Sequence, residues 1–198
     1  MKPPEPPKQK IYLTMVRHAP CNEKTKRVES ASVEKIREKS KELLKTFEGL
    51  GSKVNEPNVK IYSSPVLRAK QTAAILAHAF GLIKRGDDEI IGANEKELDS
   101  LLREAKVRVR KNLSEDTYGD ETKKLASNAQ TLAGKASETR AVKKEGPLHI
   151  VFVTHSSTIG DLILELPENI GKIAAEKLYE HPDGIPPLWH VTLKIHPQ

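Results

Sequence analysis

Short apolar runs divide the chain into elements of strand length. The runs at residues 11–16, 59–62 and 148–153 are rich in aliphatic side chains and are bounded by polar or turn-forming residues. This pattern is typical of buried strands. Residues 189–195 alternate apolar and polar positions instead, which predicts an edge strand with one face open to water. A weaker apolar stretch at residues 82–91 predicts a further strand, although a Gly-Asp-Asp sequence interrupts it.

Apolar residues at helical spacing fill the segments between these strands. Residues 32–50 and 156–166 predict one helix each, the first of them ended by glycine. Another helix is expected to start with Ser64 as its N-cap and Pro65 in its first position. Residues 94–144 are rich in Glu, Lys, Ala and Leu and predict two helices joined by a turn.

The alternation of strands and helices predicts an α/β fold. We expect a mostly parallel sheet with an antiparallel edge strand and helices on both faces, which is a three-layer α/β/α sandwich. Residues 1–10 are expected to be a disordered, proline-rich tail, because proline removes backbone donors and fixes φ. Residues 11–198 are expected to form one domain with a helical insertion at about 94–144.

Charge and cysteine content narrow the functional classes. The formal net charge of +6 favours an anionic ligand, although charge spread over Lys-rich helices can serve solubility alone. Nucleic-acid binding is disfavoured, because no basic patch interleaves with aromatic residues. Cys21 is the only cysteine, so an intramolecular disulfide is impossible. It lies three residues after His18, but a bystander role is favoured over a nucleophilic thiol.

The chain has no apolar run long enough to cross a membrane and no signal-peptide pattern. We therefore expect a cytoplasmic protein that needs no membrane. No cofactor or metal is expected: His78, His149, His181, His190 and His196 lack the spacing of metal ligands. The oligomeric state cannot be predicted, because no heptad pattern or large apolar face stands out.

Two histidines follow the most apolar strands directly. Arg17 and His18 come after the run at 11–16, and His155 comes after the run at 148–153. Ligands bind beyond the carboxyl ends of strands in open α/β sheets, so these side chains can share one site. Arg68, early in the predicted second helix, can reach the same edge. Two guanidinium groups suit a phosphoryl group, and a neutral imidazole beside them can attack phosphorus to form phosphohistidine.

Three blocks carry a resemblance to a known family. They are Val-Arg-His-Ala at 16–19, Ser-Pro-x-x-Arg-Ala-x-Gln-Thr-Ala at 64–73 and Val-Phe-Val-Thr-His at 151–155. In order and context they resemble the histidine phosphatase superfamily, also called phosphoglycerate mutase-like, and in size its short phosphohistidine phosphatases. The resemblance implies a phosphoglycerate mutase-like fold, His18 as the nucleophile, and a phosphate pocket of Arg17, Arg68 and His155.

The sequence departs from the family pattern at several positions. Ala-Pro-Cys-Asn follows His18 in place of the usual glycine and Glu-Thr pair. Asn22 can donate to phosphate, but a turn-forming role is favoured. Ser156 replaces the glycine usual after the second histidine, and we expect it to cap the next helix rather than to contact phosphate.

The general acid is the least certain part of the predicted site. The acidic residues beyond the second helix lack the family's usual setting. Glu89 is our choice among them, with a plain solvated carboxylate as the alternative. Without an acid, substrates that have good leaving groups, such as the imidazole of phosphohistidine, are still expected to react.

The leading hypothesis is a phosphatase that acts on a small phosphomonoester or on protein phosphohistidine through a phosphohistidine intermediate. Its partner is then a small phosphorylated molecule or a phosphoprotein. A phosphoglycerate mutase-type phosphoryl transfer is the nearest alternative, although such mutases are generally longer. A phosphate-binding family member with weak or lost turnover is another.

Overall fold

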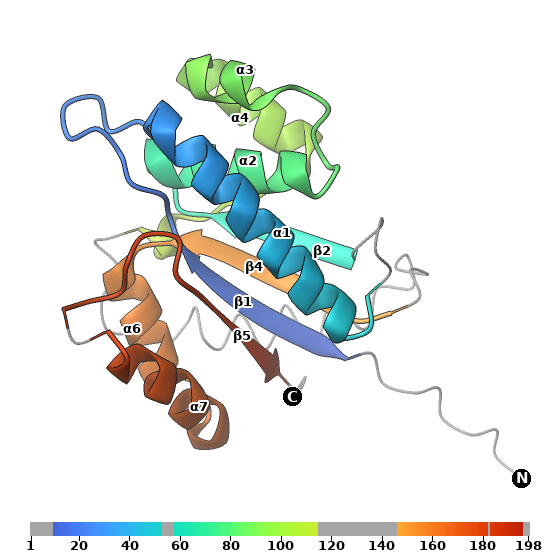
Figure 1. Cartoon of the computed structure of the whole chain (residues 1–198), viewed down its shortest axis with the longest axis vertical. Coiled ribbons are helices and arrows are strands. Elements are labelled where there is room, and N and C mark those ends of the chain that lie inside the picture. The colour runs from blue at the N-terminus through green and yellow to red at the C-terminus, as the bar shows by residue number, and fades with distance from the viewer. Residues whose placement is uncertain (1–9, 53–57, 115–145, 182, 196–198) are drawn as a thin grey trace, which may run out of the picture.

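A central sheet of five strands organises the protein, shown in Figure 1 as a computed structural model that describes residues 10–52, 58–114, 146–181 and 183–195. The strand order is β3-β2-β4-β1-β5. Neighbouring strands are parallel except at one edge, where β5 runs antiparallel to β1. The strands are β1 (Ile11–Arg17), β2 (Asn58–Ser63), β3 (Arg108–Val109), β4 (Leu148–Thr154) and β5 (His190–Ile195).

Helices cover both faces of this sheet, as the burial of the central strand β4 shows. Val151 and Val153 pack with α1–α4, whereas Leu148, Ile150 and Phe152 pack with α6 and α7. In Figure 1 the α6–α7 pair lies apart from the other helices. The fold is therefore a three-layer α/β/α sandwich, as predicted. The helices are α1 (Val33–Gly49), α2 (Leu67–Ala79), α3 (Asp87–Gly92), α4 (Glu95–Glu104), α6 (Ser156–Leu164) and α7 (Glu168–Tyr179), with 3₁₀ turns at Ser30–Ser32 and Lys111–Leu113.

Strand register brings the ends of three strands to one edge. Arg17 is paired with Thr154 between β1 and β4, and Ser63 with Val153 between β2 and β4. The next residues continue this pairing: His18 N donates to Thr154 O at 3.0 Å, and Ser64 N donates to Val153 O at 2.9 Å. His18, Ser64 and His155 consequently leave the sheet side by side.

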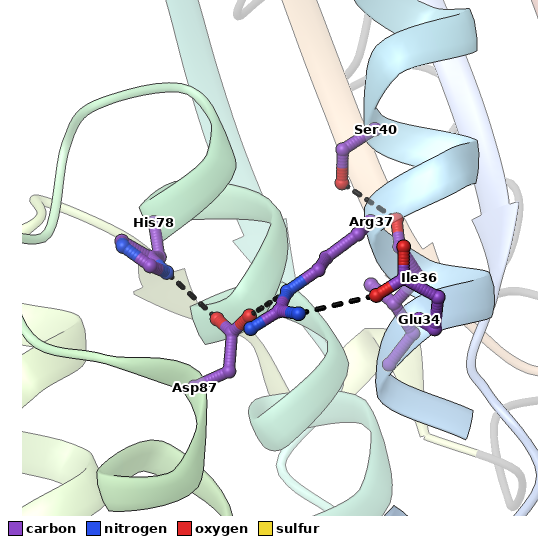
Figure 2. Close-up of polar contacts among 6 residues, drawn as sticks. All are labelled: Glu34, Ile36, Arg37, Ser40, His78 and Asp87. Carbon is purple, nitrogen blue, oxygen red and sulfur yellow. Dashed lines mark hydrogen bonds and ion pairs between the residues drawn. The ribbon is translucent and has the colours of Figure 1, made fainter. Parts of the chain in front are cut away.

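The strand predicted at residues 82–91 is wrong, because α3 occupies Asp87–Gly92. Asp87 explains the helix, since its carboxylate is only 1% exposed and accepts hydrogen bonds from Arg37 Nε at 2.5 Å and His78 Nδ1 at 2.7 Å. Figure 2 shows these contacts joining α1, α2 and α3. A buried carboxylate needs such partners, and they hold the start of α3 against the other two helices.

The predicted start of α2 is also wrong. Val66, not Ser64, is the N-cap of α2, and Pro65 lies before the helix. The physical reason is that the Ser64 hydroxyl forms a hydrogen bond with His155, which draws the serine into the site.

Part of the helical segment predicted at 94–144 is confirmed. Asn94 and Glu97 form a capping box at the start of α4. The chain then turns at Lys106, whose φ is 56°, into β3 rather than into a second helix. The rest of the prediction, at residues 115–145, lies outside the described residues, as do residues 1–9 of the predicted tail.

The edge strand matches its sequence pattern. Val191, Leu193 and Ile195 of β5 are buried, and the residues between them are half-buried or exposed. No helix in the described part of the chain is both long enough and apolar enough to cross a membrane.

Candidate active site

His18 is held as a neutral imidazole at the end of β1. Its Nε2 accepts a hydrogen bond from Arg68 Nε at 2.9 Å, so Nδ1 carries the proton and donates it to Ala19 O at 2.7 Å. Burial lowers the pKa of His18 to about 4; the bond to Ala19 opposes this, while the charges of Arg68 and Arg17 add to it. The ring therefore offers a lone pair on Nε2 near neutral pH.

His155 is a second neutral imidazole beside the first. The two ring centroids are 4.9 Å apart in an edge-on arrangement. His155 Nε2 and Ser64 Oγ form a 2.9 Å hydrogen bond, which fixes the orientation of the ring. The pKa of His155 is lowered to about 3, mainly by burial and in addition by His18 and the two arginines.

Arg17 and Arg68 supply the positive charge of the site. Arg17 Nη1 donates to Ile185 O, while its Nε is buried without a hydrogen-bond partner among the described residues. Burial lowers the pKa of Arg17, and the charge of Arg68 adds to this effect. Two neighbouring guanidinium groups are stabilised by a shared anion.

These four side chains line one cavity of about 530 Å³. The first turn of α6 forms part of its wall, and the N-terminal amides of a helix favour anions. The structure therefore brings together the four main residues that the sequence predicted. The cavity is lined by Arg17, His18, Pro20, Cys21, Glu23, Lys26, Arg68, His155, Ser156, Ser157 and Pro187.

Ser156 lines the cavity, whereas Asn22 does not. The predicted cap by Ser156 is wrong, because His155 is the N-cap of α6 and no side chain caps that helix. Ser156 lies instead in the first turn, facing the cavity. Asn22 forms the expected turn: its Oδ1 accepts from the backbone N–H groups of Lys24 and Thr25, both at 3.0 Å. Asn22 is not among the residues that line the cavity.

Glu89, the predicted acid, is not brought to this site. It lines a different cavity beside α4 and pairs with Arg85 at 3.5 Å, with 62% of its side chain exposed. The carboxylate that does line the candidate site is Glu23, which the sequence analysis missed. Its only sequence signal is its position in the loop that follows Arg17-His18.

The sequence analysis also assigned no role to the Gln-Thr pair of the second block. Thr72 Oγ1 accepts from Ala19 N at 3.1 Å and donates to Arg68 O at 2.7 Å. Gln71 Oε1 accepts from Val28 N at 2.9 Å. The two side chains thus anchor both ends of the loop after β1 to α2. No group of three or more His, Cys, Asp or Glu side chains among the described residues could hold a metal ion.

Comparisons with known proteins address the family and the fold. The family model of the histidine phosphatase superfamily (branch 1) matches residues 13–171. No curated protein matches significantly.

Several solved structures share the fold. A mycobacterial glucosyl-3-phosphoglycerate phosphatase is 18% identical with a TM-score of 0.53, over 93% of this chain and 90% of that chain. The protein titled mycobacterial hydrolase 1 is 18% identical with a TM-score of 0.52, over 93% and 92%. The protein titled mycobacterial hydrolase 2 is 17% identical with a TM-score of 0.52, over 95% and 83%.

Proposed function

Because this chain belongs to the histidine phosphatase superfamily, we propose that it is a phosphatase that acts through a phosphohistidine on His18. The substrate is a small phosphomonoester or a phosphohistidine of a protein. The observation that carries the proposal is the His18 ring, whose Nδ1–H is bound to Ala19 O while Nε2 keeps its lone pair among cations.

The reaction begins when the arginines bind the phosphoryl oxygens. Arg68 Nε then exchanges its hydrogen bond with His18 for one with an oxygen, and Nε2 attacks phosphorus. The bond to the leaving group breaks, and the leaving group takes the electron pair. The Nδ1–H bond to Ala19 stabilises the positive ring that forms, and the α6 N-terminus stabilises the oxygens. Water then discharges the phosphoryl group.

Single-turnover labelling tests this proposal. Excess enzyme is mixed with ³²P-labelled p-nitrophenyl phosphate and quenched in alkali, in which phosphohistidine survives. We expect the label on the peptide that contains His18. Product release without any labelled enzyme would reject the covalent route, and binding of phosphate without turnover would favour a phosphate-binding protein.

A substrate panel narrows the class. Phosphohistidine protein, sugar phosphates, 2- and 3-phosphoglycerate and nucleotides are compared on one preparation. We expect release of inorganic phosphate from at least one of them. Interconversion of the phosphoglycerates without release would instead indicate a mutase.

A further inference from the structure

Glu23 brings the only carboxylate to the active-site cavity among the described residues. It lies in the loop between β1 and α1, which extends beyond the carboxyl end of the sheet (Figure 1). Its Oε2 accepts a hydrogen bond from Lys26 Nζ at 2.9 Å, and Lys26 lines the same cavity. The pair therefore places a proton acceptor and a cation on the wall of the cavity.

The turn that carries this pair is firmly held. Asn22 N donates to Arg27 O and Lys26 N donates to Asn22 O, both at 2.8 Å, which closes the turn. Cys21 and Val28 form an antiparallel bridge at its base. Arg27 Nη1 donates to Ile91 O at 2.6 Å and so ties the turn to α3. Glu23 thus projects from an anchored turn.

Lys26 has an uncommon backbone conformation within this turn. Its φ of 55° lies in the left-handed region, which a non-glycine residue adopts only when its surroundings enforce it. Here the hydrogen bond to Asn22 enforces it. This conformation sets the direction of the Lys26 side chain, whose Nζ contacts Glu23 at the cavity.

Electrostatics keep Glu23 ionised. The hydrogen bond and charge of Lys26 lower the pKa of Glu23, and the charge of Arg68 lowers it further. No other carboxylate among the described residues lines the cavity, and Arg17, Arg68 and Lys26 bring positive charge to it. An ionised carboxylate can accept a proton but has none to donate.

Building on the proposed function, we infer that Glu23 is the general base of the second half-reaction. A water oxygen attacks the phosphorus of phosphohistidine while its proton passes to the Glu23 carboxylate. The P–Nε2 bond breaks, and its electron pair returns to His18. The products are hydrogen phosphate, neutral His18 and protonated Glu23, which then releases its proton to solvent.

This assignment also defines a substrate class. Glu23 is ionised and has no proton to give, and no other described residue of the cavity carries a carboxyl group that could protonate a departing alkoxide. The site therefore suits leaving groups that depart without help: aryl oxides, and imidazoles that already carry a proton, as in phosphohistidine. Alkyl phosphates are expected to react slowly in the first step.

Chemical quench with p-nitrophenyl phosphate tests the role of Glu23. In Glu23→Gln, we expect phosphoenzyme to form at the wild-type rate and to accumulate, while its hydrolysis slows by about 10²-fold or more, the usual contribution of a general base. Glu29→Gln is the matched control, because Glu29 is an exposed carboxylate of the same loop that does not line the cavity. It is expected to match wild type.

The pH profile of phosphoenzyme hydrolysis adds a second measurement. Lys26→Met removes the ion pair that lowers the pKa of Glu23, so the fall in hydrolysis rate at acidic pH should begin at a higher pH. In Glu23→Gln this acidic limb of the profile should be absent. The assignment would be overturned if phosphoenzyme did not accumulate in Glu23→Gln, or if the acidic limb of the profile did not move in Lys26→Met. Absence of phosphoenzyme in every protein, wild type included, would instead reject the covalent route itself.

Discussion

The two ends of β4 each hold a buried histidine, yet only one of them belongs to the candidate site. His149, near the start of the strand, is fully buried, and its ring stacks on Phe47 at 3.9 Å between centroids. Its Nε2 forms a 2.6 Å hydrogen bond with Ser52. His155, just after the strand, forms the equivalent bond with Ser64. In both residues, burial is the largest cause of a lowered pKa.

The difference lies in what surrounds each ring. Aromatic rings surround His149, with Tyr12 stacked at 5.4 Å in addition to Phe47. His155 faces a cavity with two guanidinium groups and a second imidazole. A neutral buried histidine is thus not by itself a sign of catalysis. Access for a ligand and neighbouring cations give the ring a chemical use.

The sharpest test of this comparison is a pair of variants. His18→Ala should lower turnover of p-nitrophenyl phosphate by at least about 10³-fold, since it removes the proposed nucleophile. His149→Phe should keep turnover within about threefold, because an aromatic ring can replace the stacked imidazole. Circular dichroism checks that both variants fold. Comparable losses in the two variants would contradict the contrast.

Arg68→Ala probes the cations that distinguish the two ends. We expect competitive inhibition by phosphate or vanadate to weaken by about 1.5 to 3 kcal/mol, the usual worth of a hydrogen bond to a charged group. Arg68→Lys keeps the charge but loses the planar fork, so its inhibition constant should lie between those of Arg68→Ala and wild type. An unchanged constant in Arg68→Ala would remove Arg68 from the phosphate pocket.

Sequence patterns were sufficient to predict the layers of the fold and the convergence of the four main candidate residues. Apolar runs predicted the strands, and strand ends in a parallel sheet share one edge, so the convergence of Arg17, His18 and His155 followed. The strand predicted at 82–91 was wrong because Ile90 and Ile91 belong to a short helix whose start is set by Asp87. That carboxylate bonds Arg37 of α1 and His78 of α2, contacts that no local pattern contains.

Local rules also misplaced the serines of the site. Ser64 and Ser156 both lie near the starts of helices, where a serine usually caps. In the structure the Ser64 hydroxyl forms a hydrogen bond with His155, and Ser156 lies inside the first turn of α6. Glu23 was missed because its place on the cavity depends on how the loop folds back, which Arg27 and Gln71 enforce through contacts distant in sequence.

The burial of His149 should make the stability of the fold depend on pH. Its folded pKa of about 4 lies below the ordinary value of 6.5. Above pH 6.5 the neutral His149 ring contributes its full stabilisation to the folded state. This stabilisation is lost as the pH falls toward 4, because the histidine takes up a proton at a higher pH in the unfolded chain than in the folded one. The loss is at most about 3 kcal/mol. Urea unfolding from pH 7 to 4 should show that the free energy of unfolding of wild type falls relative to that of His149→Phe as the pH falls; a difference that does not change with pH would contradict this.

Thr72 offers the smallest effect, because it acts on His18 only through the backbone. Its hydroxyl accepts from Ala19 N, while Ala19 O accepts from His18 Nδ1, so the same residue links α2 to the imidazole. Thr72→Val keeps the shape but leaves the buried Ala19 N–H without its acceptor, at a cost of about 1 to 3 kcal/mol in unfolding free energy. Turnover should fall by less than about tenfold, since the nucleophile remains. Thr72→Ser keeps the hydroxyl and should recover most of both quantities; if it behaves like Thr72→Val, packing of the methyl group rather than the hydrogen bond holds the loop beside His18.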